Sequence, residues 1–295
     1  MRQFNASVVV EWHILWYYLP MHIRIRRTLF WIAVVLFFAV AFITIRYAQG
    51  YIYDFEARRF VRTGAIAVAA NTDAKLFIDD EYAGDLSIVT HRAGKTRLDP
   101  GSHTVRLVRD EWSAWSKEVI VEEGLLTDFG HVLLLPTDEA GIAALQDEAS
   151  RSLVESFTLA DATPTPSPTP RPRGATPTPL PRVDDGDFML WGTGLFRRDG
   201  TASGSFIADG VLGFQAQDDR VLWWTQHEVW VYWNRDTGDQ PLHKAGDREL
   251  LGRWTTRIKD AAWFRDRYHV VVDLGTQGYR VLELDTRGGM NVVRF

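Results

Sequence analysis

Residues 218–242 read DDRVLWWTQHEVWVYWNRDTGDQPL, and residues 265–293 read RDRYHVVVDLGTQGYRVLELDTRGGMNVV. Both stretches run in the same order: an acidic residue, an apolar strand, a polar or glycine turn, a second apolar strand and then an Asp-Thr pair. The repeat predicts successive antiparallel β units, because apolar segments split by turn residues form hairpins. The fold class is therefore expected to be mainly β.

The spacing of the repeat narrows the kind of β unit. Asp218 lies 48 positions before Asp266, and a period of about 40 to 50 residues with several strands is typical of propeller blades. The second unit resembles a blade of the TolB-like and WD40-like propellers, whose strand Trp, turn Asp and closing Asp-Thr positions are matched by Trp263, Asp266, Asp285 and Thr286. Residues 184–295 are therefore predicted to be propeller-like β repeats.

The length of this region does not suffice for a closed propeller. A ring needs at least about four blades, whereas residues 184–295 have room for little more than two. An incomplete ring leaves sheet edges and apolar faces unpaired, which is unfavourable. Three outcomes are open: a shortened version of a longer propeller protein, assembly with further copies, or a compact β-sandwich made from the same strands. Shortening is favoured because the sequence ends directly after the strand 290–295.

The same region holds seven of the twelve tryptophans. Strand alternation sends Trp223 and Trp224 to opposite faces of their sheet. Packing inside the β repeats is the expected use of these rings, but a tryptophan on a solvent face also stacks on sugars or binds proteins. The candidate ligand-binding residues are Trp223, Trp224, Trp230 and Trp233.

Two segments precede the repeats. Residues 161–183 form a Pro/Thr-rich linker with eight of the twelve prolines. Polyproline II geometry would let about twenty residues reach about 60 Å, so we expect a semi-rigid spacer; an SH3-type or WW-type ligand and an O-glycosylated stalk are alternatives. Residues 138–160 are predicted to form an amphipathic helix that caps the preceding domain, since apolar residues recur at spacings of three and four: Ile142, Leu145, Ala149, Leu153 and Phe157.

Residues 62–137 are predicted to form a small β domain. Polar and apolar residues alternate in HTVRLV (103–108) and KEVIVE (117–122), as half-buried strands require. The order of strands, turns and a late Trp resembles the PEGA family, and the matching residues are Asn71, Ala74, Ile78, Asp79, Gly84, Leu98, Pro100, Gly101, His103, Val105, Trp115 and Val121. The resemblance implies a PEGA-like β-sandwich of a bacterial membrane-anchored surface protein, acting as a structural or interaction module without catalytic residues.

Residues 28–45, TLFWIAVVLFFAVAFITI, contain no charge. Extended to Tyr53 the run is long enough to cross a bilayer, so residues 28–53 are predicted to form a transmembrane helix and residues 1–27 a short cytoplasmic tail. The first 61 residues carry a charge of +4 and the rest carry −9. An Arg cluster before the run and a long acidic part after it favour a cytoplasmic N-terminus and an extracytoplasmic bulk. A cleaved signal peptide is the alternative.

Several classes of chemistry have no basis in the sequence. Zero cysteines exclude disulfides, thiolate catalysis and Cys-based metal sites, and the net charge of −5 argues against nucleic-acid binding. The eight histidines form no H-x-H or H-E-x-x-H pattern. Asp79, Asp80 and Glu81 would alternate faces on a strand, so they are expected to form a solvated turn and no Ca²⁺ site. No catalytic residue, cofactor or metal is expected.

The sequence therefore predicts a membrane-anchored, non-catalytic structural or interaction module of the cell envelope. Its expected partners are the bilayer, through residues 28–53, and an envelope polysaccharide or another surface protein. The alternative is a carbohydrate-binding or sensor protein that uses aromatic residues of the C-terminal β region.

Overall fold

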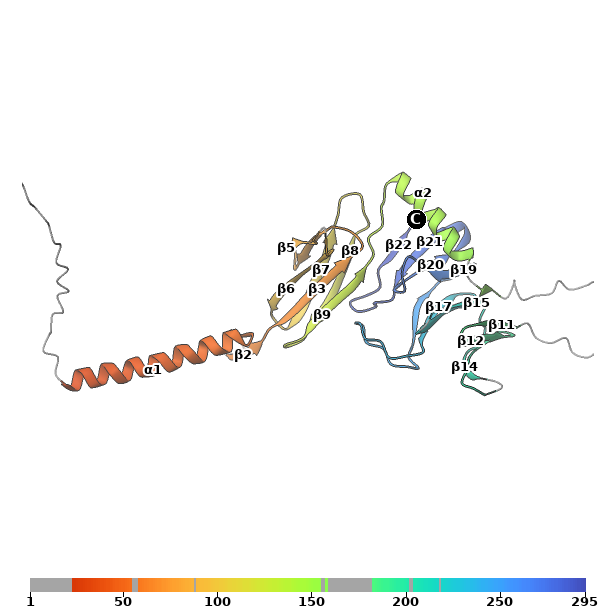
Figure 1. The fold of residues 1–295 in the computed structure, drawn as a ribbon. Coiled ribbons are helices and arrows are strands. Elements are labelled where there is room, and N and C mark those ends of the chain that lie inside the picture. The colour runs from red at the N-terminus through yellow and green to blue at the C-terminus, as the bar shows by residue number, and fades with distance from the viewer. Residues whose placement is uncertain are drawn as a thin grey trace, which may run out of the picture. The chain divides into compact units, whose positions relative to one another are not determined.

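The structure, a computed structural model, describes residues 23–54, 58–87, 89–154, 157–158, 182–201, 204–217 and 219–295 (Figure 1). The chain divides into two compact units, residues 1–60 and 61–295, which are described separately. Most of the predicted cytoplasmic tail and residues 159–181 of the predicted linker lie outside the described residues.

The first unit contains the apolar helix α1 (Ile23–Ala48). Its 26 residues have a mean hydropathy of 2.7 in the most apolar window, so the helix is long and apolar enough to cross a membrane. At about 1.5 Å per residue it exceeds the hydrocarbon core of about 30 Å. The predicted span to residue 53 is wrong at its end: Gly50 has a φ of 82°, and Tyr51–Asp54 form strand β1. The chain continues into β2 (Arg59–Arg62), which pairs with β1.

The second unit begins with a two-sheet sandwich, β3 to β9, which lies inside the predicted 62–137 domain. One sheet has the order β6-β3-β9 and the other β5-β4-β7-β8, and the β3–β9 pair is parallel. Alternating residues of both sheets, such as Val68, Leu76, Val105 and Leu107, form a buried core. The strands are β3 (Gly64–Ala70), β4 (Lys75–Ile78), β5 (Glu81–Asp85), β6 (Arg92–Leu98), β7 (Gly101–Val108), β8 (Trp115–Val121) and β9 (Leu126–Val132).

The rest of the second unit contains three antiparallel sheets in chain order, each with four consecutive strands. The first sheet is β11 (Arg182–Asp185), β12 (Phe188–Trp191), β13 (Gly194–Arg197) and β14 (Ser205–Ala208). The second is β15 (Gly213–Ala216), β16 (Arg220–Trp224), β17 (Glu228–Trp233) and β18 (Arg248–Arg253), extended by β10 (Phe157–Thr158). The third is β19 (Asp260–Trp263), β20 (His269–Asp273), β21 (Tyr279–Glu283) and β22 (Val292–Arg294), with the 3₁₀ turn Gly275–Gln277 between β20 and β21.

These sheets pack face to face in the order first, second, third. Trp223 and Phe214 of the second sheet share a core with Leu190 of the first. On the other face of the second sheet, Trp224 and Val231 share a core with residues of the third. The described residues form no closed ring, and they contain three successive antiparallel sheets where the repeat indicated little more than two units. The strands of the first sheet lie outside the repeat because they lack its closing Asp-Thr pair.

The predicted helix forms as α2 (Glu139–Val154), but the expectation that it caps the preceding domain is wrong. Leu145, Ala149 and Leu153 pack on the outer face of the third sheet, against Phe264 and other apolar side chains. Arg265 holds Glu148 with two hydrogen bonds of 2.9 and 2.8 Å. The sandwich already fills its own core, whereas the third sheet has apolar residues on both faces and needs a cover.

The Pro/Thr-rich linker does not separate two bodies. The strand before it, β10, pairs with β15 of the second sheet, and the strand after it, β11, is the first strand of the neighbouring first sheet. Both ends of residues 159–181 therefore attach to the C-terminal sheets. We expected these residues to be a spacer between the sandwich and the C-terminal region. Instead they connect two neighbouring sheets of one unit.

Candidate functional site

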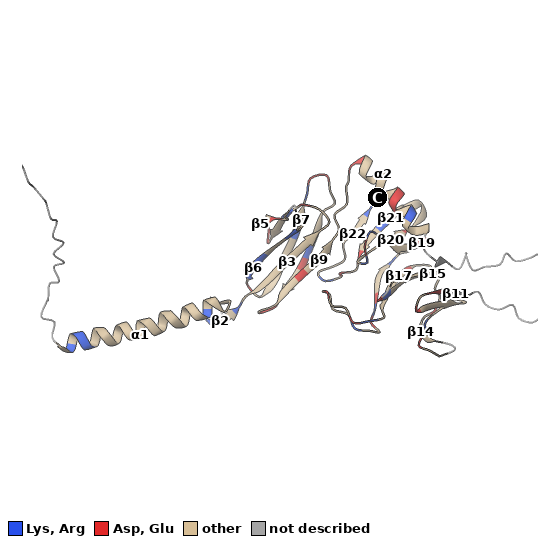
Figure 2. Ribbon diagram, in the orientation of Figure 1, with Lys and Arg blue, Asp and Glu red and all other residues tan. Residues whose placement is uncertain are grey.

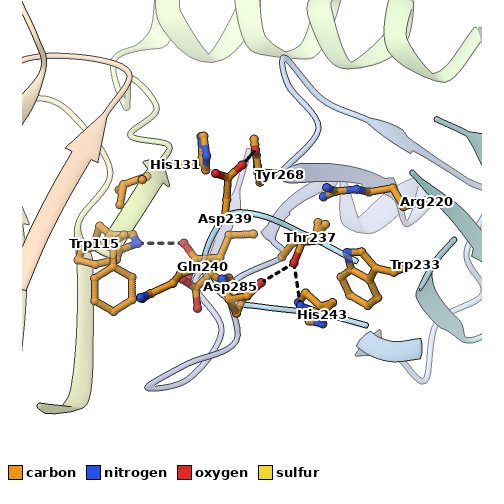
Figure 3. A pocket seen from close by; sticks show the side chains of 16 residues that line it. Trp115, His131, Arg220, Trp233, Thr237, Asp239, Gln240, His243, Tyr268 and Asp285 are labelled. Atoms are coloured by element: carbon orange, nitrogen blue, oxygen red, sulfur yellow. Dashed lines mark hydrogen bonds between the residues drawn. The ribbon is translucent and has the colours of Figure 1, made fainter. Parts of the chain in front are cut away.

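The sandwich and the C-terminal sheets meet along a seam, formed by strands β8 and β9 on one side and two loops on the other (Figure 3). The loops are residues 234–247, between β17 and β18, and residues 284–291, between β21 and β22. The seam encloses a cavity of about 40 Å³, enough for a few water molecules. Its polar and aromatic lining includes Trp115, His131, Arg220, Trp233, Thr237, Asp239, Gln240, His243, Tyr268, Glu283 and Asp285.

A buried ion pair crosses the seam. Lys117 of β8 contacts Glu283 of β21, and their side chains are 0% and 7% exposed. The ammonium group of Lys117 also donates to the carbonyl oxygen of Asp285. Glu283 accepts a hydrogen bond of 2.9 Å from Nε1 of Trp115 and one of 3.2 Å from Asn291. A buried charge without a partner is strongly unfavourable. The sandwich supplies the cation of this pair and the third sheet supplies the carboxylate.

The free edge of β9 is closed by side chains of the C-terminal loops. Gln240 Nε2 donates to the carbonyl oxygen of Leu126 at 2.9 Å, and the backbone N–H of Asp128 donates to Gln240 Oε1 at 3.0 Å. Arg287 donates to the carbonyl oxygen of Asp128 at 2.7 Å and to Gln240 Oε1 at 2.7 Å. The amide of Gln240 thus pairs with the strand edge much as a neighbouring strand would.

Two aromatic stacks line the cavity. His131 lies flat on Tyr268, with ring centroids 3.4 Å apart, and the Tyr268 hydroxyl donates to Asp239 at 2.9 Å. His243 stacks on Trp233 with centroids 3.6 Å apart. Burial lowers the pKa of His131 and of His243, because it disfavours the charged imidazolium. Burial, followed by the hydrogen bond to Asp239, raises the pKa of Tyr268.

The seam is suited to holding two parts of the chain together. Glu283 is engaged by Lys117, and Asp285 by Arg287. Trp233 Nε1 and His243 Nε2 are buried and have no hydrogen-bond partner among the described residues. Both residues line the seam cavity, which has room for water molecules.

Comparison with protein-family models, with curated proteins and with solved structures found no match. The PEGA-like and propeller-like resemblances therefore stay predictions from the sequence. What the seam does has to be inferred from its own geometry and charges.

The four predicted ligand-binding tryptophans are mostly inside the C-terminal sheets. As the alternation predicts, Trp223 and Trp224 face opposite sides of the second sheet, and both are buried, as is Trp233. Trp230 is half-buried, stacks on Trp223 with ring centroids 6.0 Å apart, and donates to Glu228 at 2.9 Å. Of the four, only Trp233 reaches the seam cavity.

The sequence reasoning missed the exposed aromatic residues of the first sheet. Trp191 is 47% exposed and Phe206 is 63% exposed. Register places Met189 beside Phe196 and Phe196 beside Phe206, so these side chains share the face that turns away from the second sheet. The run FMLW (188–191) indicated this, because its four residues are all apolar and a strand with such a sequence is apolar on both faces.

The acidic run at residues 79–81 forms the solvated turn that was expected: Asp79 and Asp80 are turn residues with positive φ, Glu81 begins β5, and all three are exposed. Each carboxylate has its own basic partner: Asp79 contacts His103, Asp80 contacts Arg106 and Glu81 contacts Lys95. Carboxylates that diverge to three partners cannot converge on one ion. In the described parts of the chain, no group of three His, Cys, Asp or Glu side chains is placed to hold a metal.

Proposed function

We propose that the protein is a membrane-anchored, extracytoplasmic interaction module of the cell envelope that acts by binding and not by catalysis. The observation that carries this proposal is the seam. The Lys117–Glu283 pair and the Gln240 amide join the sandwich and the C-terminal sheets into one body. A body joined in this way suits the rigid display of binding surfaces.

The anchoring part of the proposal rests on α1. The helix is long and apolar enough to span a bilayer, and the basic residues Arg24, Arg26 and Arg27 lie at its start (Figure 2). With an acidic part of more than 200 residues after the helix, the charge distribution supports a cytoplasmic N-terminus. The bilayer is then the first partner of the chain.

The resemblance to PEGA domains supports an interaction role for the sandwich. Its seven strands form within the predicted 62–137 region, and the turn residue Asp79 contacts His103 of β7 at 2.6 Å. A cell-envelope partner, either a polysaccharide or another surface protein, follows from this role.

Fractionation and protease access test the proposed topology. The full chain, with a tag at each terminus, is expected to resist alkaline extraction of membranes and to dissolve in detergent. Protease added to intact spheroplasts should remove the C-terminal tag and spare the N-terminal tag. Release by alkali, or protection of the C-terminal tag, would contradict the proposal.

A second candidate function is glycan binding, and the exposed face of the first sheet favours it. Trp191 and Phe206 offer aromatic surface to solvent beside the Asp184–Arg198 ion pair, whose atoms lie 2.9 Å apart. Aromatic rings flanked by charged groups suit sugar rings. Trp191→Ala should abolish binding to isolated envelope polysaccharide, whereas Trp230→Ala should not; equal binding by both variants would rule this function out.

A further inference from the structure

A second, open site lies beside the seam. Its volume is about 450 Å³, within the range of ligand sites, and it runs between the end of β8 and the start of β9. We call it the groove, and it is lined by Glu118, Val119, Ile120, Glu122, Leu125, Leu126, Thr127, Gln240, Arg287 and Gly288. The last three belong to the C-terminal loops, which separate the groove from the seam cavity.

Large apolar side chains are exposed in the groove. Ile120 is 74% exposed, Leu125 55% and Leu126 47%. Single exposed apolar residues are common, but three that line one concave site mark a binding surface. None of the three contributes to the sandwich core.

The groove lies at the outer edges of two strands. In the described sheets β8 pairs only with β7, and β9 pairs only with β3. The loop at Gly288 closes part of the β8 edge, since a Cβ there would lie 2.2 Å from the carbonyl oxygen of Glu118. Gln240 closes β9 at Leu126 and Asp128. The β9 backbone groups at Leu126 and Asp128 are therefore already engaged, and a ligand in the groove would contact the side chains that line it.

The charge of the groove is acidic. Glu118 accepts a hydrogen bond of 2.8 Å from Ser102. Glu122 is exposed and makes no ion pair within the described residues. The one cation of the lining, Arg287, is already paired with Asp285 at 2.6 Å.

We propose that the groove binds an extended peptide segment of an envelope protein, with apolar side chains against Ile120, Leu125 and Leu126 and a Lys or Arg side chain against Glu122. Contacts with the three exposed apolar side chains would supply affinity, and the acidic rim would supply selectivity. This site rests on the interaction role proposed above and names its partner. A lipid surface fits less well, because acidic side chains are repelled by anionic headgroups.

The test uses the full chain in phosphatidylcholine nanodiscs and a fluorescent heptapeptide of alternating Val and Thr with two Lys residues. The control peptide carries Glu in place of Lys. Binding of the Lys peptide is read by anisotropy, and amide hydrogen exchange locates it. We expect saturable binding tighter than about 1 mM, weaker binding of the Glu peptide, and slower exchange at residues 118–127.

Two pairs of exposed residues provide matched variants. Glu122→Lys should weaken binding about threefold or more, while Asp110→Lys, with the same charge change outside the groove, should not. Ile120→Ser should weaken it about tenfold, while Val89→Ser should not. All four positions are exposed, so the variants are expected to fold, and circular dichroism verifies this.

Three outcomes would overturn the proposal. One is no binding of the Lys peptide up to about 1 mM. Another is binding that is unchanged by Glu122→Lys and Ile120→Ser, or that slows amide exchange only outside residues 118–127. The third is protection of residues 118–127 by the nanodisc alone, relative to detergent, without peptide binding, which would assign the groove to lipid. Because the peptide is added directly, failure here leaves the topology experiment unaffected, and failure of the topology experiment leaves this result standing.

Discussion

The opening of the sandwich between β8 and β9 has two halves that are built in different ways. In the seam half, Lys117, Leu126 and Asp128 meet side chains of the C-terminal sheets, and the charged groups are buried and paired. In the groove half, Ile120 and Leu125 stay exposed beside an unpaired carboxylate. The opening between β8 and β9 thus has two uses. The C-terminal loops cover the seam half, which stabilises the fold, and the groove half stays open. Substitutions in the seam should therefore lower the free energy of unfolding strongly, and substitutions in the groove should change it little.

The largest effect is expected at the buried ion pair. Lys117→Met leaves the Glu283 carboxylate buried without its cation, so the free energy of unfolding should fall by about 3–5 kcal/mol. Urea unfolding of the full chain in detergent, followed by tryptophan fluorescence, measures the loss. The double variant Lys117→Met with Glu283→Gln should recover part of it, because no buried charge remains. A loss below about 1 kcal/mol, the value of an exposed pair, would show that the pair is not buried.

Gln240 is expected to have a smaller effect. Gln240→Ala removes the amide that pairs with Leu126 and Asp128, and the free energy of unfolding should fall by about 1–3 kcal/mol. Amide exchange at Asp128 should become faster, while exchange in β7, which does not contact Gln240, should not change. Unchanged exchange at Asp128 would mean that the edge of β9 is not closed by this side chain.

Acidification should weaken the seam. The folded-state pKa of His243 lies below its usual value of 6.5, because burial disfavours the charge. Its contribution to stability is therefore complete above about pH 6.5 and is lost as the pH falls toward the folded pKa. His243→Phe keeps a ring on Trp233 and should flatten the fall of the thermal midpoint between about pH 7 and pH 5.

His103 provides a control of opposite sign. Burial opposes its charge, but the hydrogen bonds to Asp79 and to the carbonyl oxygen of Asp99 outweigh this, and its pKa is raised. Its stabilising effect is complete below the unfolded pKa and is lost as the pH rises through the folded pKa. His103→Gln should therefore steepen the acid-side fall that His243→Phe flattens. Equal pH profiles for the two variants would contradict these assignments.

The smallest effect is expected in the groove. Ile120→Ser should change the free energy of unfolding by less than about 0.5 kcal/mol, since the side chain is exposed and outside the core. The same urea measurement tests it. A loss as large as that of Lys117→Met would mean that both halves of the opening stabilise the fold and would remove the distinction between them.

Local patterns predicted much of the fold. The alternation in residues 103–108 and 117–122 indicated strands that form as β7 and β8, and the apolar run at residues 28–45 lies inside α1. The spacings of three and four at Leu145, Ala149 and Leu153 indicated α2. These features depend on neighbours within a few residues, which a sequence displays directly.

The partners of these elements were harder to predict. Contacts between distant residues decide that α2 covers the third sheet. They also decide that the strands on either side of the linker, β10 and β11, join the C-terminal sheets. The seam ion pair joins residues 117 and 283, which no local pattern connects. One signal was present: Lys117 has the same strand parity as the inward-facing Val119 and Val121, so a buried lysine in need of a distant carboxylate could have been expected.

The central claim is that residues 61–295 form one body held by the seam and that residues 161–181 only connect parts of it. Introducing a protease site between residues 170 and 171 of the full chain and cutting it tests this most directly. The two fragments should elute together in non-denaturing size-exclusion chromatography, and combining Lys117→Met with Gln240→Ala should weaken their association, although α2 still packs on the third sheet. Separation of the fragments without those substitutions would contradict the account.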